Sequence, residues 1–182
     1  RGGGGALVPS LGAWFRVGHE AFEIHLALDA PALVYGGLSL GLIGLVAAFS
    51  RRYLHREPGF HRFYALLLVF LTGLQIVSFA GSLDVLLIGW ELVGLASTLL
   101  IAFFNRRPKP VRNALRAFVT YRVCDVGLVL AILLLHHGWG GASLSSATNG
   151  WLALPVDGTA PVALVGLCLL LAAAGQSAQV PF

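Results

Sequence analysis

Four long apolar segments dominate this chain, over residues 30–50, 63–81, 84–104 and 114–136. A bilayer core of about 30 Å needs roughly 20 apolar residues to be crossed as a helix. A fifth segment begins near Pro161 and continues to residue 182. Because backbone polar groups in lipid must be satisfied internally, all five are predicted to be helices. Their continuity argues against the alternating pattern of a membrane β-barrel.

The composition supports a membrane environment. Hydrophobic residues make up 57% of the chain and charged residues 11%, whereas soluble domains carry about 25% charged residues. The predicted fold class is all-α, a polytopic transmembrane helix bundle. Residues 1–29 are expected to form an external loop or hairpin, and residues 30–182 the transmembrane domain with a truncated last helix. Since the sequence has no Met and its fifth segment is short, we expect a fragment of a longer protein.

The charges outside the apolar segments predict the orientation of the chain. Arginines cluster in residues 51–62, and arginines with one lysine cluster in residues 106–116, whereas residues 137–160 contain neither Lys nor Arg. Short basic loops stay on the cytoplasmic side. Both basic loops are therefore predicted to be cytoplasmic and residues 137–160 external, in a multi-pass protein of the inner (plasma) membrane.

Three ionisable residues stand inside the apolar segments. Glu91 lies within the third segment, and Arg122 and Asp125 lie near the middle of the fourth. Such residues are costly in lipid and usually mark a proton or ion route, or a partner charge. Arg122 and Asp125 are three residues apart and can pair on one helix face. Glu91 has no basic residue within a helical turn, so its partner must be on another helix, in a cavity, or a proton.

The other polar and small residues have simpler interpretations. Asp29 and Asp84 are predicted to be N-caps of the first and third helices, and Gly37 and Gly41 form a small-xxx-small pair that would permit close helix approach. Cys124 and Cys168 lie in apolar runs and are predicted to be structural. No metal site is assigned, because the six histidines have no paired spacing on a helix. The sequence likewise contains no phosphate-binding loop, flavin site or cysteine cluster, and so no redox centre is expected in this chain.

Several stretches together resemble the L subunit of NADH–quinone oxidoreductase (complex I), which is equivalent to mitochondrial subunit 5. The matching stretches are residues 62–65, 89–95 (GWELVGL), 116–126 (RAFVTYRVCDV) and 175–182 (GQSAQVPF). Residues 11–15 resemble the outer hairpin that precedes the family's third helix. The resemblance implies that the chain holds most of the first antiporter-like inverted repeat. Its five helices would correspond to the family's third to seventh, with a helix break near Pro181.

The resemblance also implies the site. Glu91 matches the family's glutamate of the fifth helix, and Arg122 and Asp125 match a charged pair on the sixth. Gln176 stands where the family has a lysine, which is thought to exchange protons under the influence of the glutamate. A glutamine amide cannot carry a proton as a charge. The relay could be rerouted beyond this chain, the subfamily could differ in its pumping, or the residue could be a sequencing error.

The function implied is a proton-translocating subunit that is coupled to quinone reduction in partner membrane subunits. NADH and quinone would bind only to those partners, so the chain would be part of a translocase without its own redox centre. One alternative is a membrane subunit for inorganic-carbon uptake, driven by the proton gradient and paired with a soluble zinc protein. Another is a subunit of a multi-subunit sodium/proton antiporter. In a fourth interpretation the charges only fix helix packing. A nucleic-acid partner is not expected, since topology explains the basic loops.

Overall fold

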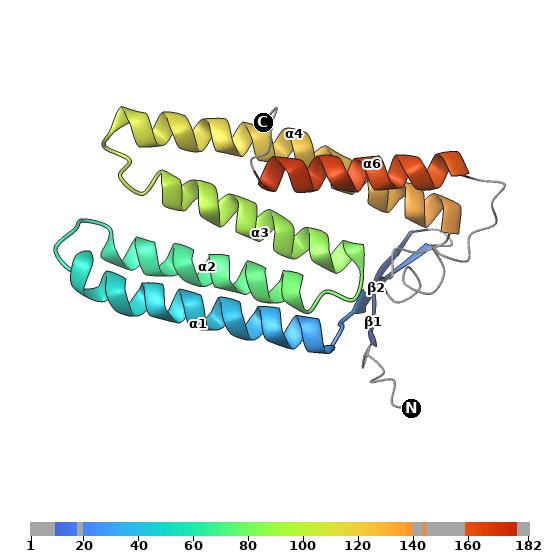
Figure 1. Ribbon diagram of the computed structural model, residues 1–182, viewed down its shortest axis with the longest axis horizontal. Coiled ribbons are helices and arrows are strands. Elements are labelled where there is room, and N and C mark those ends of the chain that lie inside the picture. Colours follow the sequence, from blue (N-terminus) through green and yellow to red (C-terminus); the bar gives the residue numbers. More distant parts are fainter. Residues whose placement is uncertain (1–9, 18–19, 140–143, 145–158, 178–182) are drawn as a thin grey trace.

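The described part of the chain is a bundle of helices that run side by side, with a small β-hairpin at one end (Figure 1). The computed structural model describes residues 10–17, 20–139, 144 and 159–177. In chain order the elements are β1 (Ser10–Val17), β2 (Glu20–His25), α1 (Ala30–Tyr53), α2 (Phe60–Ser78), α3 (Leu83–Ile101), α4 (Pro108–Trp139) and α6 (Thr159–Gln176). The predicted all-α membrane bundle is therefore confirmed, with one antiparallel hairpin added to it.

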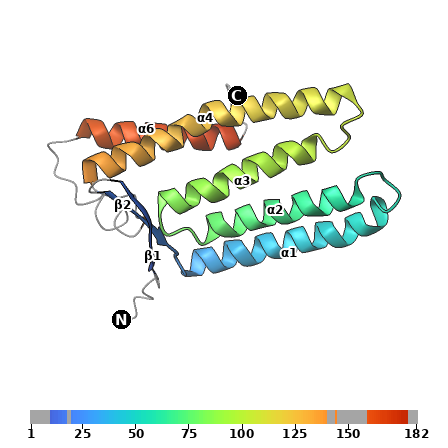
Figure 2. The ribbon, with the colours of Figure 1, turned by 180° about the vertical axis from the view of Figure 1, so that it is seen from behind.

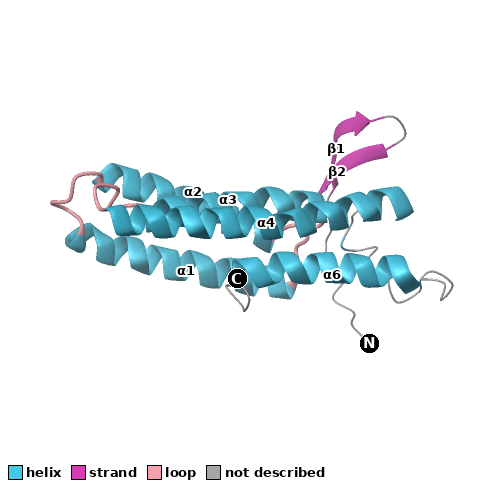
Figure 3. Ribbon diagram, turned by 90° about the horizontal axis from the view of Figure 1, so that it is seen from above, coloured by secondary structure: helices cyan, strands magenta, loops and turns pink. Residues whose placement is uncertain are grey.

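Within the described residues, four helices, α1 to α4, are long and apolar enough to cross a membrane. The apolar part of α6, Val162–Gln176, is shorter. Consecutive helices run in opposite directions, so the links α1–α2 and α3–α4 lie at one end and the hairpin lies at the other (Figure 2). The view from above shows the hairpin projecting to one side of the helices (Figure 3). We refer to the end with the two arginine-rich links as the basic end, and to the opposite end as the hairpin end.

The fourth predicted helix begins earlier than the sequence pattern indicated. The prediction placed its start at residue 114, but α4 starts at Pro108 and includes Lys109, Arg112 and Arg116 in its first turns. Proline fits the first position of a helix because no intrahelical N–H bond is lost there. Lysine and arginine are good helix formers, and their long side chains can reach polar surroundings. Hydropathy located the apolar part of this helix and missed its basic extension.

The two predicted N-caps have different outcomes. Asp29 caps α1, where its Oδ1 accepts a hydrogen bond from the N–H of Ala32 at 2.8 Å. The prediction for Asp84 is wrong, because Ser82 is the N-cap of α3 and its Oγ accepts from the N–H of Val85 at 3.4 Å. Serine has the extended backbone that a cap requires. Asp84 instead lies in the first turn of α3 and is available for another contact.

Small residues set the closest helix contacts. A Cβ added to Gly73 of α2 would lie 2.9 Å from Val93 N, and one added to Gly89 of α3 would lie 2.8 Å from Gly73 O. Backbones that approach this closely are typical of helix packing in membranes. The prediction for Gly37 and Gly41 is not tested by the described residues, where a Cβ at either position would meet nothing within 4 Å. Their neighbour Gly36 faces α2 instead, against Phe79 and Gln75.

The hairpin is fixed to the bundle through the short link between α2 and α3. The N–H of Gly81 donates to His25 O at 2.8 Å, and the N–H of Ala27 donates to Phe79 O at 3.0 Å. The main apolar core lies nearby, between α3, α4 and α6; its buried members are Leu83, Leu128, Ala131, Ile132, Leu135, Val165, Cys168 and Ala172.

Candidate functional site

The three charged residues singled out in the sequence meet in one cluster. Arg122 of α4 forms an ion pair with Glu91 of α3, and its Nη2 lies 2.8 Å from Asp125 Oδ2. Trp90, next to Glu91, donates from Nε1 to Asp125 Oδ1 at 2.7 Å. One guanidinium is thus shared by two carboxylates from two helices. The pairing of Arg122 with Asp125 agrees with their spacing, whereas only the fold identifies Arg122 as the partner of Glu91.

Gln176 joins this cluster from the last turn of α6. A Cβ added to Gly94 of α3 would lie 3.2 Å from Gln176 Nε2 and 3.4 Å from Arg122 Nη2. Gln176 and Arg122 therefore approach the same point on α3. All four predicted site residues come together at this point.

Small residues allow α6 to bring Gln176 this close. Gly175 packs directly against the side chain of Cys124, and Gly127 packs against the carbonyl oxygen of Cys168. Since neither glycine has a Cβ, the axes of α4 and α6 can approach closely along this contact. Cys124 and Cys168 are both free thiols and buried, as expected for structural cysteines. The narrow contact places the end of α6 at the level of Asp125.

The cluster lies deep within the helices that carry it. Glu91 follows the first residue of α3 by eight positions, or about 12 Å at 1.5 Å per residue. Asp125 stands near the middle of α4 and is only 3% exposed, whereas the side chains of Glu91 and Arg122 are 34% and 35% exposed. With every group ionised, the three side chains carry a net charge of about −1. Uptake of one proton would make the cluster neutral.

A second ionisable pair, not predicted from the sequence, lies at the hairpin end. His136 near the end of α4 has its Nε2 3.1 Å from both carboxylate oxygens of Asp84 in the first turn of α3. The His136 imidazole is buried. A signal was present in the sequence: Asp84 and His136 both stand at the ends of apolar segments, and antiparallel helices bring such ends together.

A bundle of membrane helices with carboxylates and a guanidinium paired at depth is typical of ion-translocating membrane proteins. Comparison with protein families specifies the class further. Residues 80–182 match the family described as NADH:quinone oxidoreductase/Mrp antiporter, TM, and residues 14–64 match NADH-Ubiquinone oxidoreductase (complex I), chain 5 N-terminus. The chain belongs to this family of antiporter-like membrane subunits, as the resemblance predicted.

Individual relatives agree with this assignment. The chain is 33% identical over 168 residues to NADH-quinone oxidoreductase subunit L of Mycobacterium tuberculosis (strain CDC 1551 / Oshkosh), covering 92% of the chain and 26% of that protein. It is 33% identical over 171 residues to subunit L of Escherichia coli (strain K12), covering 94% and 28%. The chain thus spans about a quarter of the length of these relatives.

A solved structure matches as well. The Mrp complex from Dietzia sp. DQ12-45-1b has a TM-score of 0.85 and 28% sequence identity, covering 97% of this chain and 19% of that chain.

Two earlier predictions lie mostly or wholly outside the described residues. They are the helix break near Pro181 and most of the external loop at residues 137–160.

Proposed function

We propose that the chain is a proton-translocating membrane subunit of an NADH–quinone oxidoreductase-like respiratory complex. The observation that carries this proposal is Arg122, shared deep in the bundle between Glu91 and Asp125. Relatives named as subunit L support it. In this proposal NADH and quinone react in partner subunits, and this chain contributes the proton route.

The geometry suggests how the cluster could take up and release a proton. Asp125 is buried, and both Trp90 and Arg122 donate to its carboxylate. Glu91 is more exposed, and Arg122 is its only ion-pair partner among the described residues. Protonation of Glu91 would leave Arg122 paired with Asp125 alone and the cluster neutral. Loss of that proton would return Arg122 to both carboxylates.

Electrostatics gives the size of the coupling. Two unit charges about 5 Å apart interact by roughly 3 kcal/mol at an effective dielectric of 20. That energy corresponds to about a hundredfold change in proton affinity. A charge that moves toward or away from Glu91 would therefore change the fraction of Glu91 that carries a proton. Gln176, as a neutral amide, would orient the cluster and leave the carboxylates as the groups that exchange the proton.

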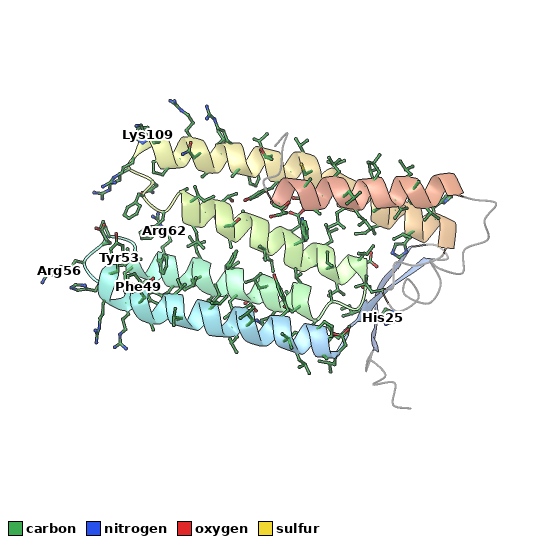
Figure 4. The ribbon with its side chains drawn as sticks, in the orientation of Figure 1. His25, Phe49, Tyr53, Arg56, Arg62 and Lys109 are labelled. Carbon is green, nitrogen blue, oxygen red and sulfur yellow. The ribbon has the colours of Figure 1, made fainter. Side chains whose placement is uncertain are left out.

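The proposed orientation follows the charge distribution. Arginines of the α1–α2 link and of the start of α4 gather at the basic end, where Arg56, Arg62 and Lys109 are labelled (Figure 4). Positive charge is retained on the cytoplasmic side of membranes. In the proposal the basic end is therefore cytoplasmic and the hairpin end external, in the inner membrane of a bacterium.

The experiment uses the full-length subunit in its assembled complex, reconstituted into sealed vesicles. Glu91→Gln is expected to reduce proton translocation at least about tenfold, because the amide cannot exchange a proton. The control is Glu57→Gln, which changes an exposed glutamate in the link between α1 and α2. Full translocation in the Glu91→Gln complex would rule out this proposal.

The structural match to the Mrp complex favours one second candidate, a subunit of a cation/proton antiporter. The two functions differ in what drives proton movement. Sodium-dependent proton exchange in vesicles without a redox substrate would favour the antiporter, whereas translocation that requires quinone reduction would favour the respiratory complex. A neighbouring gene for a soluble zinc protein would point instead to carbon uptake.

A further inference from the structure

We propose that Asp84 and His136 form a proton-exchange site at the hairpin end, which binds and releases protons that pass the Glu91–Arg122–Asp125 cluster. The inference rests on the proposed function, since it assigns a second station to the same route. It concerns residues that lie outside the motifs by which the chain resembles its family. The ligand of the site is a proton, supplied by or delivered to water at this end of the bundle.

The contact geometry identifies the imidazole as the group that changes charge. One nitrogen, His136 Nε2, lies 3.1 Å from both oxygens of Asp84. With Asp84 ionised, the Nε2–H donates to both oxygens, so the imidazole is fixed in one orientation and tautomer. The proton taken up then adds to the other ring nitrogen, Nδ1. The pair changes from a net charge of −1 to zero, and no other atom is transferred.

Asp84 stands at the N-terminal end of α3. The carboxylate lies in the first turn of α3, where the free N–H groups and the helix dipole stabilise negative charge. Ser82 already provides the N-cap hydrogen bond, so α3 does not need Asp84 as a cap. Histidine is the side chain that gains and loses a proton near neutral pH. A fixed carboxylate beside an imidazole is thus an arrangement suited to proton exchange.

His136 is surrounded by apolar side chains, so a change in its charge affects the stability of this end of the bundle. The imidazole is 7% exposed, and Leu135 and Ile132 of the apolar core precede it on α4. In such surroundings a net charge is costly, so the gain or loss of one proton by the pair changes the energy of this end of the bundle. An exposed ion pair on the protein surface would contribute less to stability than this buried pair, because water screens its charges.

Other titratable groups at this end are few among the described residues. His25 of β2 lies beside the start of α3 and is labelled in Figure 4, Asp29 caps α1, and His137 of α4 is exposed. On α6, the core members at this level are Val165 and Cys168, which carry no charge at neutral pH. Asp84 and His136 are the pair that links α3 to α4 here.

The pair and the deeper cluster stand on the same two helices. Asp84 precedes Glu91 by seven residues on α3, about 10 Å along the axis, and His136 follows Asp125 by eleven residues on α4, about 16 Å. The interval contains apolar core side chains, including Leu128 and Ala131. An apolar layer blocks proton transfer, so in this proposal protons pass between the two sites only when water enters the layer and connects them. A shift of α3 against α4 would change both sites together.

The test compares two adjacent histidines in the full-length subunit, assembled in its complex and reconstituted in sealed vesicles. His136→Gln keeps an N–H donor for Asp84 but cannot become charged, and His137→Gln is the matched exposed control. Proton translocation by His136→Gln is expected to fall about tenfold, with its dependence on external pH flattened between about pH 5 and 8. His137→Gln is expected to retain both the rate and the pH profile.

Three outcomes are informative. Loss of translocation in Glu91→Gln, together with an unchanged rate and pH profile in His136→Gln, would overturn this inference and leave the proposed function intact. Unchanged translocation in both variants would overturn the proposed function as well. If His136→Gln lowers assembly, Asp84→Asn is the second variant, because its amide keeps an acceptor for His136 and removes the charge. An unaltered pH profile in the assembled Asp84→Asn complex would contradict the proposal.

Discussion

At the scale of single residues, the charge at position 176 should control the stability of the buried cluster. Gln176 approaches Arg122 beside Gly94, where Glu91 and Asp125 already exceed the one guanidinium by one negative charge. Gln176→Glu adds another and is expected to destabilise the subunit by about 3 kcal/mol, the interaction of two unit charges about 5 Å apart at a dielectric of 20. Gln176→Lys neutralises the excess and is expected to be neutral or stabilising.

Thermal unfolding of the purified complex in mild detergent would measure both changes. The two substitutions place similar side-chain volumes at the same site, so each serves as the control for the other. The loss of stability in Gln176→Glu should be smaller at pH 6 than at pH 8, because protonation of the new carboxylate removes the added charge. Equal destabilisation by Lys and Glu would show that packing, and not charge, decides what position 176 accepts.

The residues of this cluster could be predicted from the sequence, but their contacts only in part. Ionisable side chains inside apolar segments stand out because lipid penalises them, which identified Glu91, Arg122 and Asp125. Spacing on one helix predicted the Arg122–Asp125 pair. The Glu91–Arg122 pair and the Trp90 hydrogen bond depend on how α3 lies against α4. His136 was missed because nothing local in the sequence shows that a histidine at a helix end is buried against an aspartate.

At the scale of elements, the packing of α2 on α3 should depend on two glycines. A Cβ at Gly89 would lie 2.8 Å from Gly73 O and from Val77 N. Both of these are backbone atoms, which cannot move aside as a flexible side chain can. Gly89→Ala is therefore expected to destabilise the protein by about 1–3 kcal/mol, the usual cost of overpacking. Because Gly89 stands two residues before Glu91, the variant should also weaken the Glu91–Arg122 pair.

The matched control for this prediction is Gly41→Ala in α1, where the added Cβ meets no atom within 4 Å in the described structure. Alanine there is expected to be neutral, or to stabilise the helix by up to about 1 kcal/mol. Thermal unfolding in detergent compares the two variants directly. Equal stability of Gly89→Ala and the parent protein would mean that α2 and α3 can separate without cost.

Element positions were more predictable than element contacts. The length of each apolar run identified α1 to α4, because a bilayer requires about 20 residues in each helix. Hydropathy could not locate the start of α4, since its first turns are basic and still helical. Nor could spacing alone show which glycines pack within the described residues: Gly37 and Gly41 have the expected interval, yet it is Gly73 and Gly89 that meet a neighbouring helix there.

At the scale of the whole molecule, charge and polarity are divided between the two ends of the bundle. Among the described residues most arginines lie at the basic end, while the hairpin end carries Asp29, Asp84, His25, His136 and His137. The intervening surface is apolar, and large side chains such as Leu33, Leu45 and Phe49 are exposed along α1. Such a surface suits contact with lipid, or with further helices of the kind that the longer relatives have room for. The division predicts that the two ends lie on opposite sides of the membrane.

Single cysteines would test this division in sealed cells or vesicles. Cys124 and Cys168 are 0% and 9% exposed, so a membrane-impermeant maleimide is expected to leave them largely unlabelled. His137→Cys places a thiol at the hairpin end and should react from outside. Glu57→Cys places one in the α1–α2 link at the basic end and should react only after permeabilisation, because basic loops are retained in the cytoplasm. The opposite labelling pattern would invert the proposed route, with protons leaving the cluster toward the cytoplasm through Asp84 and His136.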